Sequence, residues 1–383
     1  MEKKKLIRLT TVPISLEKLL ENQLRFMKDY YEVTMVSSDQ DYLEKVGKLQ
    51  QCPVYHVEMT RKITPIQDLK SVWKLYRFLK KQQPFIVHSH TPKAGIVGML
   101  AAKLAGVPHR LHTVAGLPLL EATGNKRKLL DFVEKLTYRC ATMVYPNSKG
   151  LRDIILENQY ADADKIKVIG NGSSNGIDTA HFSAEQYTAQ QNEQRKKELG
   201  FSDSDFIFIF VGRLVKDKGI NELVAAFEKL HAQYDNAKLL LVGDYETDLD
   251  PLLPQTLDKI QNSKFIVTTG FRNDVRPYFA ISNVLVFPTY REGFPNVVLQ
   301  AGAMGLPSIV TNINGCNEII EQEQNGLIIP VKNEQAIFEA MQRLISDKNL
   351  YISLRNEARQ HIVSHFEQQV VWEAILAEYQ KLE

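Results

Sequence analysis

Residues 289–307 read TYREGFPNVVLQAGAMGLP and follow the apolar run NVLVFP at residues 283–288. The run is short, contains β-branched residues and ends in a proline, which predicts a buried parallel strand that stops just before a loop. A tight turn then leads to Pro295, where the first turn of a helix tolerates a missing N–H group. We expect this helix to run to about Met304 and to end at Gly305.

This order of strand, turn and helix predicts an anion-binding site. Unpaired backbone N–H groups and the positive end of the helix dipole face the same point, so the amides of Asn296 and Val297 are candidate phosphate donors. Glu292 lies at the mouth of the expected site, and Gln300 lies about a turn and a half deeper in the helix. The two side chains can therefore contact different parts of one elongated ligand. The turn between Glu292 and the helix consists of Gly293, Phe294 and Pro295.

A second candidate site follows the apolar run FIFIFV at residues 206–211, which predicts a buried strand. The next residues, 212–219, read GRLVKDKG and lead from Gly212 into a helix. Arg213 and Lys218 are cations suited to stabilise the negative charge of a phosphate or diphosphate group. The motif differs from a Walker P-loop, which requires GKS or GKT. A surface ion pair is the alternative interpretation of the two cations.

The order and spacing of three motifs resemble those of the family 4 retaining nucleotide-sugar glycosyltransferases. These motifs are GRLVKDKG at 212–219, EGFPNVVLQAGAMG at 292–305 and GCNEI at 315–319. In the first half, HTPKAG at 90–95 and HTVAGLP at 112–118 are similar to members that build bacterial surface polysaccharides such as capsule and lipopolysaccharide. The resemblance implies a GT-B fold, a nucleotide-sugar donor such as a UDP-sugar as substrate, and a reaction without a metal ion or other cofactor.

The resemblance also implies catalytic roles for single residues. Arg213 and Lys218 would neutralise the leaving diphosphate, with help from the helix start at Asn296. Glu292 would orient the donor sugar, and His112 would bond one of its distal hydroxyl groups.

Two further donor contacts follow from the family pattern. Gln300 stands where the family has a second glutamate that holds the ribose hydroxyls. A glutamine accepts the same hydrogen bond without charge assistance, which leaves about half its strength. In the family, the backbone after the strand expected at 265–269 receives the base, which makes Phe271 and Arg272 candidate donor-binding residues.

Strands alternate with helices through both halves of the chain. This alternation predicts an α/β protein with two doubly wound, Rossmann-like domains that face each other across a cleft. The turn-rich stretch at 170–178 and the polar stretch at 184–197 predict the interdomain linker. We expect an acceptor-binding domain over residues 1–185 and a donor-binding domain over 186–365, with a last helix at 366–383 that crosses back to the first domain.

In the first domain the pattern predicts one helix at 16–29 and a last strand at 165–169. A helix from Pro65 carries apolar residues at helical spacing, which predicts a core stripe: Leu69, Val72, Trp73, Tyr76 and Leu79. Its basic positions predict a solvated face: Lys70, Lys74, Arg77, Lys80 and Lys81.

Three histidines follow or lie in predicted strands of the first half. His88 and His90 would lie on one face of a strand, because side chains alternate with period two. They could ligate a metal, but no third ligand stands nearby, and an acceptor-side or structural role is favoured for His90 and for Lys93. His112 alone would be interpreted as a satisfied core histidine, whereas its family context favours a functional role.

Composition limits the class of protein. Residues 1–180 hold 28 Lys and Arg against 18 Asp and Glu, and the remainder holds 19 against 27. A basic half joined to an acidic half suggests that the first half faces a negatively charged partner. No apolar run approaches the roughly 18 residues that span a bilayer, and the N-terminus lacks a secretory apolar segment. The three scattered cysteines predict neither a disulfide framework nor a zinc site, and we expect a cytoplasmic protein.

The helix expected over residues 125–139 carries a basic stripe. Lys128, Lys135 and Arg139 fall within about 40° of one another, with Phe132 beside them. Such a stripe is typical of a helix that lies on anionic lipid, although an ordinary exposed helix explains it as well. The basic first half favours the membrane, so we expect a peripheral protein on the inner face of the cytoplasmic membrane that does not bind nucleic acid.

The sequence therefore predicts a retaining glycosyltransferase. It would move a hexose or N-acetylhexosamine from a UDP-sugar to a lipid-linked saccharide. Two alternatives remain open: an epimerase of the same fold that acts on a sugar nucleotide without an acceptor, and a non-catalytic protein that binds nucleotide-sugars.

Overall fold

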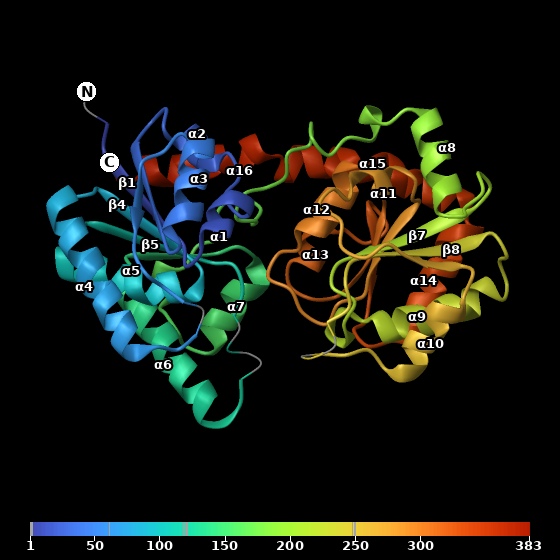
Figure 1. Cartoon of the computed structure of the whole chain (residues 1–383), viewed down its shortest axis with the longest axis horizontal. Coiled ribbons are helices and arrows are strands. Elements are labelled where there is room, and N and C mark those ends of the chain that lie inside the picture. Colours follow the sequence, from blue (N-terminus) through green and yellow to red (C-terminus); the bar gives the residue numbers. More distant parts are fainter. Residues whose placement is uncertain (1–2, 61, 118, 120–121, 247, 249) are drawn as a thin grey trace. The chain divides into compact units, whose positions relative to one another are not determined.

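The computed structural model describes residues 3–60, 62–117, 119, 122–246, 248 and 250–383. The chain forms two compact units (Figure 1). The first unit contains residues 1–175 and 368–383, and the second contains residues 176–367. The stretch 176–185, assigned to the first domain from the sequence, thus belongs to the second unit, and the last helix belongs to the first.

The first unit is built on a six-stranded parallel sheet with the order β3-β2-β1-β4-β5-β6. Its strands are β1 (Lys5–Leu9), β2 (Glu32–Ser37), β3 (Val54–His56), β4 (Ile86–His90), β5 (His109–Val114) and β6 (Met143–Pro146). The central strands are buried almost throughout, because helices cover both faces. This is the strand order typical of a doubly wound Rossmann sheet, as the alternation of elements predicts.

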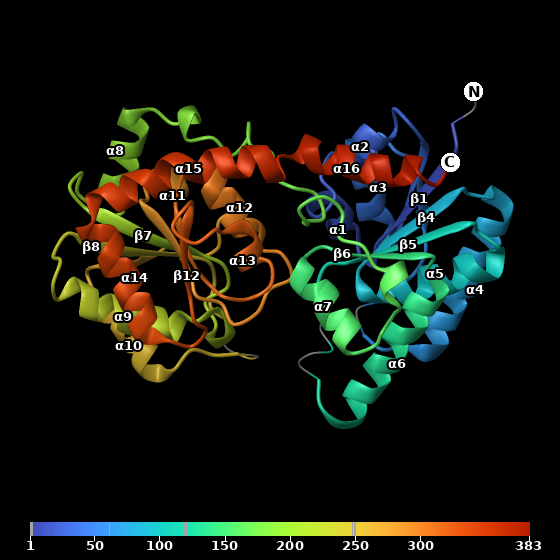
Figure 2. The ribbon, with the colours of Figure 1, turned by 180° about the vertical axis from the view of Figure 1, so that it is seen from behind.

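Two sets of helices cover this sheet (Figures 1 and 2). One face carries α4 (Pro65–Gln82), α5 (Pro92–Ala105), α6 (Gly124–Cys140) and α7 (Lys149–Glu157). The other face carries α1 (Pro13–Lys18), α2 (Gln23–Met27), α3 (Gln40–Gln50) and α16 (Gln368–Gln380). Helix α16 buries Val371, Ile375 and Tyr379 in the core of the first unit.

Two elements of the first unit differ from the sequence prediction. The single helix expected at 16–29 is divided into α1 and α2, because Asn22 takes a left-handed conformation with φ of 57°. The prediction of a strand at 165–169 is wrong. Residues Ala163–Lys165 form a 3-10 turn, and Ile166 forms an isolated bridge to Val144 of β6.

Helix α4 corrects a prediction about the core. Val72, Leu75 and Leu79 are buried, but Leu69 and Trp73, which were assigned to the core stripe, are 66% and 62% exposed. The helix therefore carries two apolar stripes, and only one of them contacts the unit to which it belongs.

The second unit repeats the arrangement with the sheet order β12-β11-β10-β7-β8-β9. Its strands are β7 (Phe206–Val211), β8 (Ala237–Val242), β9 (Ile266–Thr268), β10 (Val284–Phe287), β11 (Ser308–Thr311) and β12 (Gly326–Ile329). All of its neighbouring strands pair in parallel. The run FIFIFV forms the central strand β7, whose middle four residues are buried, as its uniform apolar character predicts.

Helices cover both faces of the second sheet as well (Figure 1). They are α9 (Ile220–His231), α10 (Pro254–Asn262), α11 (Arg276–Ala280), α12 (Asn296–Ala303), α13 (Cys316–Ile319), α14 (Glu334–Ser346) and α15 (Lys348–Phe366). Helix α8 (Ala189–Glu198) buries no residue and packs against α11. Within the described parts of both units, no helix combines the length and apolarity needed to cross a membrane.

The strand order places the candidate site. Strands β7 and β10 pair at the centre of the sheet. The chain continues from β7 through β8 and β9 to one edge, and from β10 through β11 and β12 to the other. In doubly wound sheets, ligands bind beyond the carboxyl ends of the strands at such a switch point. The loops after β7 and β10, which carry the two motifs found in the sequence, therefore leave the sheet side by side.

Candidate active site

The two motifs meet through one ion pair. Lys218, from the 3-10 turn Lys216–Lys218, contacts the carboxylate of Glu292 through its Nζ and Oε1 atoms. The side chains are only 15% and 19% exposed, so solvent screens the pair weakly. The Nζ atom also lies 5.8 Å from the centre of the Phe287 ring at the end of β10.

A glycine allows Lys218 to approach this loop. Gly219 has φ of 71°, a conformation that residues with a side chain rarely adopt. A Cβ atom there would collide with the carbonyl oxygen of Pro288, which precedes the Glu292 loop. The glycine of the GRLVKDKG motif thus keeps the two loops close enough for the ion pair.

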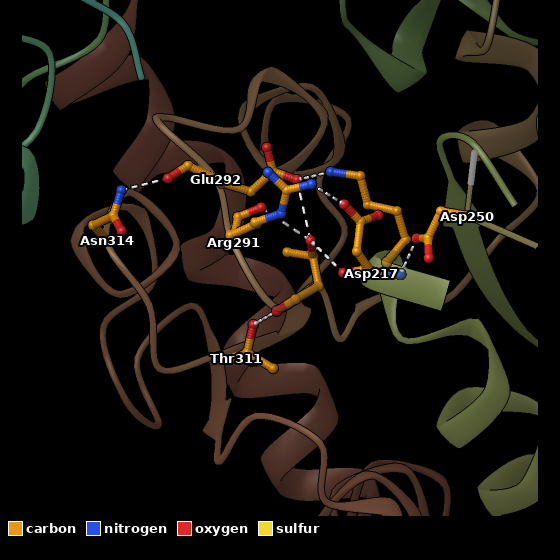
Figure 3. Close-up of polar contacts among 8 residues, drawn as sticks. Asp217, Asp250, Arg291, Glu292, Thr311 and Asn314 are labelled. Carbon is orange, nitrogen blue, oxygen red and sulfur yellow. Dashed lines mark hydrogen bonds and ion pairs between the residues drawn. The ribbon is translucent and has the colours of Figure 1, made fainter. Parts of the chain in front are cut away.

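The loop that carries Glu292 is fixed from the side of β11. The amide of Asn314 donates to the backbone carbonyls of Glu292 and, at 3.3 Å, of Gly293. The hydroxyl of Thr289 lies 3.3 Å from Oε1 of Glu292, and Thr311 donates to the carbonyl of Thr289 (Figure 3). The orientation of the Glu292 carboxylate therefore depends on contacts with residues of the same unit.

The other side of the loop is held by Asp217. Its Oδ2 atom accepts from Arg291 at 2.6 Å, and its backbone N–H donates to Asp250 at 2.7 Å (Figure 3). Its carbonyl accepts from the backbone N–H of Tyr290 at 2.9 Å. Partial burial raises the pKa of Asp217, while the neighbouring Lys218 opposes this shift. Asp250 thus stabilises this turn by accepting a hydrogen bond from the backbone.

Arg213, the other predicted cation, has a different partner. Its Nη1 atom pairs with Glu246, which lies after β8, and its side chain is 56% exposed. It also acts electrostatically on Asp217, which places its charge near the turn that carries Lys218. Both candidate phosphate-binding cations are therefore paired with carboxylates.

The predicted anion site at the start of α12 has the expected local structure. The helix begins at Asn296 with Pro295 as its N-cap, and Gly305 follows its end with φ of 81°. Asn296 is exposed, and Val297 and Gln300 are partly exposed. Phe294 is partly buried and its ring lies 5.6 Å from that of Phe366.

The predicted base-binding segment lies after β9. Phe271 is 65% exposed, and its backbone N–H donates to Oδ1 of Asp244 at 2.8 Å. Arg272 is exposed. The adjacent Gly270 bridges to Gly243, which ties this segment to the end of β8.

His112 lies in the interior of the first unit. It is 2% exposed, and its Nδ1 atom lies 2.8 Å from the hydroxyl of Ser89. A Cβ atom on Gly95 of α5 would lie 2.5 Å from Cε1 of His112, so only glycine leaves room for the ring. Burial lowers the pKa of His112 to about 4, and the imidazole is therefore neutral at pH 7.

His88 and His90 lie on one face of β4, as alternation predicts, with ring centres 4.6 Å apart. His88 bonds Tyr379 through Nδ1 at 2.5 Å and Thr113 through Nε2 at 2.7 Å. Nε2 of His90 lies 2.7 Å from Nη2 of Arg8. Burial lowers the pKa of both histidines well below the usual value. Both ring nitrogens of His88 are occupied, so metal ligation would require these bonds to break.

Arg8 is the centre of this buried network. Its guanidinium is fully buried, donates to Gln23 at 2.6 Å and to Tyr379 at 2.5 Å, and has no ion pair with a carboxylate among the described residues. No local sequence pattern indicates the contact between Arg8 and Tyr379, because the two residues are 371 positions apart.

The remaining predicted residues of the first unit are cations. Lys93 forms a 2.5 Å ion pair with Asp68 of α4 and is 12% exposed. On α6, Lys128, Lys135 and Arg139 are all exposed, and Phe132 is 63% exposed. The basic stripe predicted from the helical spacing therefore lies on the surface.

Sequence reasoning missed the residues that hold the Glu292 loop. Asp217 lies inside the GRLVKDKG motif, and Asn314 immediately precedes GCNEI. Their places in or beside these motifs could have identified both as candidate site residues. Glu246 has no comparable signal, because it stands in a loop without a recognisable motif.

Comparisons with known proteins follow the same division of the chain. Residues 23–172 match the family described as "Glycosyl transferase 4-like domain", and residues 191–361 match "Glycosyl transferases group 1". The chain is 34% identical to the capsular polysaccharide biosynthesis glycosyltransferase CapM of Staphylococcus aureus, over 99% of this chain and 97% of that protein. It is 33% identical to the UDP-Gal:alpha-D-GlcNAc-diphosphoundecaprenol alpha-1,3-galactosyltransferase of Escherichia coli, over 80% of this chain and 78% of that protein.

Solved structures support the fold. Anabaena Alr3699/HepE in complex with UDP has a TM-score of 0.82 at 17% identity, covering 98% of this chain and all of that one. WaaG, a glycosyltransferase involved in lipopolysaccharide biosynthesis, has a TM-score of 0.68 at 15% identity, covering 96% and 98%. At these identities the likeness concerns the fold: two doubly wound units, as the sequence predicts.

Proposed function

We propose that this chain, which belongs to the family 4 glycosyltransferases, transfers a hexose or N-acetylhexosamine from a UDP-sugar to a lipid-linked saccharide. The name of the E. coli relative contains both a UDP-sugar and a diphosphoundecaprenol-linked saccharide. The relative that matches almost the whole chain acts in capsular polysaccharide biosynthesis. These names support a role in surface-polysaccharide synthesis and favour transfer over the epimerase alternative.

The observation that carries the proposal is the contact between Lys218 and Glu292. It joins the GRLVKDKG motif to the EGFP motif beyond the carboxyl ends of two paired strands. A cation that can bind phosphate and a carboxylate that can bind hydroxyl groups are thereby adjacent. A nucleoside diphosphate sugar carries its phosphate groups next to the hydroxyl groups of the sugar. One such ligand could therefore contact Lys218 with a phosphate and Glu292 with a hydroxyl group.

The cations would act on the leaving group. As the bond between the sugar and the diphosphate breaks, negative charge grows on the phosphate oxygen. Lys218 and Arg213 would stabilise that charge, and the backbone N–H groups at the start of α12 would add to it. Lys218 would exchange its bond to Glu292 for a phosphate oxygen, which would release the carboxylate to orient the sugar.

The other contacts with the donor are proposed for the residues that the family pattern indicates. Gln300 would hold the ribose, and Phe271 and Arg272 would lie near the base. We propose retention of configuration, with an oxygen of the leaving phosphate accepting the proton of the acceptor. The two cations supply positive charge where a metal ion would otherwise act, so the reaction would need no divalent cation.

The acceptor would be reached at a membrane. The exposed basic stripe of α6 supports binding to anionic lipid on the inner face of the cytoplasmic membrane. Phe132 beside the stripe would enter the interface between headgroups and acyl chains.

Thermal shifts with UDP-, GDP- and ADP-sugars test the donor assignment. A ligand at 100 times its dissociation constant adds about 2.7 kcal/mol of stability, which is readily measured. We expect a shift with UDP-sugars alone, and incorporation of label from that sugar into a polyprenyl-diphosphate-linked saccharide. A shift with GDP- or ADP-sugars alone would refute the UDP assignment, and binding without transfer to any lipid extract would favour the non-catalytic alternative.

A further inference from the structure

We propose that an exposed apolar ridge at the start of α4, formed by Ile63 just before the helix and by Ile66, Leu69 and Trp73 on it, inserts into the interface of an anionic bilayer. We call these four residues the α4 ridge. The inference rests on the proposed action on a lipid-linked acceptor, and it adds a second membrane contact on a helix other than α6. Its test measures insertion separately from sugar transfer.

The exposure of the α4 ridge is concentrated. The four side chains are 53%, 75%, 66% and 62% exposed in chain order. Along the described residues, no other stretch of eleven positions exposes more than two large hydrophobic side chains. On a helix of about 100° per residue, Ile66, Leu69 and Trp73 fall within about 60° of one another. They form one continuous stripe, and contiguous exposed apolar surface marks interaction sites.

The opposite stripe of α4 makes the ridge a fixed surface. Val72, Leu75 and Leu79 are buried against the sheet of the first unit. Trp73 stacks on Tyr76 with ring centres 5.3 Å apart. The ridge is therefore presented by an anchored helix, so its apolar area is available without rearrangement of the helix.

The charged residues around the α4 ridge favour anionic lipid as its partner. Exposed cations flank the ridge: Lys62, Lys70, Lys74, Arg77 and Lys81. The single acidic residue of α4, Asp68, is engaged by Lys93 at 2.5 Å. A protein interface over this ridge would have to pair or desolvate these cations, whereas anionic headgroups supply negative charge around an apolar interior. Tryptophan beside lysine is the composition typical of a membrane interface.

The position of α4 fits this role. Helix α5 packs between α4 and α6, so the three helices form one layer on the same face of the sheet (Figures 1 and 2). Helix α6 exposes Phe132 and Leu129 beside its own cations. The α4 ridge would supply apolar insertion, and α6 would add electrostatic attraction.

The fluorescence of Trp73 reports on insertion. The chain has one other tryptophan, Trp372, which is partly buried and donates a hydrogen bond to Asn175 at 2.7 Å. The full chain is mixed with vesicles of equal parts phosphatidylglycerol and phosphatidylcholine. We expect Trp emission to move to shorter wavelength and to be quenched by brominated acyl chains. Trp73→Phe should remove the response, which assigns it to Trp73 and not to Trp372.

The second measurement is vesicle sedimentation of Leu69→Ser combined with Trp73→Ser. We expect binding to weaken at least about tenfold, since two large apolar side chains no longer leave water. The control, Val331→Ser with Ile352→Ser, replaces two apolar side chains of the second unit that are 41% and 42% exposed, and it should bind as the wild type does. Far-ultraviolet dichroism and the UDP-sugar thermal shift should be unchanged in both variants.

Several results would overturn the inference. Wild-type vesicle binding by the Leu69→Ser, Trp73→Ser variant would do so, as would unquenched Trp73. A dimer in lipid-free buffer that this variant dissociates would show that a second copy covers the ridge. Transfer to a detergent-dispersed acceptor separates the two proposals: transfer without insertion refutes the ridge alone, and insertion without transfer refutes the proposed reaction alone.

Discussion

Lys218 and Glu292 neutralise each other in a largely buried ion pair, although they are 74 positions apart in the chain. Each charge is therefore satisfied before any donor arrives. A diphosphate must compete with Glu292 for Lys218, and the sugar hydroxyl groups must replace Lys218 at Glu292.

Glu292→Ala should reduce turnover by at least about a hundredfold, because it removes the carboxylate proposed to orient the sugar. Affinity for UDP should stay equal to the wild type or increase, since Lys218 no longer has a competing partner. Steady-state kinetics and UDP titration check the two effects. Equal losses of turnover and UDP affinity would refute a sugar-facing Glu292. Glu292→Gln is the control that keeps the hydrogen bond with the hydroxyl of Thr289.

Lys218→Met should weaken UDP binding by tenfold or more and lower the free energy of unfolding by about 1–3 kcal/mol, because it leaves a carboxylate without its partner. Adding Glu292→Gln should restore most of the stability but not the UDP affinity. A double-mutant cycle on both quantities separates the structural role of the pair from its role in binding. Additive stability losses in the cycle would show that the pair contributes nothing to the fold.

Gln300→Glu should preserve folding and equal or increase the affinity for UDP, because a carboxylate adds charge assistance to a bond with ribose. Calorimetric titration with UDP measures the affinity. A variant that fails to fold would show that the side chain of Gln300 stabilises the fold and does not serve the ribose, and the control Gln300→Ala should fold but bind UDP more weakly.

The buried carboxyl group of Glu134 should make the free energy of unfolding depend on pH. It is 7% exposed on α6, and burial raises its pKa to about 7. Between its unfolded pKa near 4.5 and this folded value, the folded protein holds more protons, so stability falls as the pH rises. Glu134→Gln removes this effect. Its gain in stability over the wild type should grow from near zero at pH 4.5 to about 3 kcal/mol above pH 7.

Denaturant titrations of both proteins at several pH values test this prediction. His112, whose pKa burial lowers to about 4, gives the opposite dependence, but both proteins contain it and its effect cancels. A difference between the two proteins that is constant with pH would show that Glu134 titrates normally.

Charge reversal of Lys128, Lys135 and Arg139 to Glu should abolish sedimentation with anionic vesicles, since about 1 kcal/mol of attraction is lost with each cation before repulsion is added. Donor affinity should not change. The matched control reverses three exposed cations of the second unit, Lys264, Lys348 and Arg355, and alters the net charge equally. Equal loss of binding by both variants would leave only a net-charge effect.

Much of the fold was predictable from the sequence because local patterns determine it. The uniform apolar run at 206–211 and the proline-terminated run at 283–288 are buried parallel strands, as predicted. The helix from Asn296 to Ala303 ends at its glycine. These signals act over a few residues and need no knowledge of distant partners.

The errors came from information that a local pattern lacks. On α4 both apolar stripes have the same helical spacing, and only the contacts of the folded unit show that the stripe with Leu69 and Trp73 faces outward. Likewise, Lys218 and Glu292 were both candidate residues, but their ion pair depends on the pairing of β10 with β7. The carboxylate partner of Arg213 had no sequence signal at all.

The bond between Arg8 and Tyr379 has a consequence for how the protein is made. Tyr379 lies on α16, which a ribosome produces only after all of residues 176–367. Until then a cation destined for complete burial lacks one of its hydrogen-bond partners, and the apolar face under α16 stays open. Domains usually mature in the order of translation. Here all residues of the second unit are synthesised before the helix that completes the core of the first unit, so the first unit can complete its core only after the second has left the ribosome.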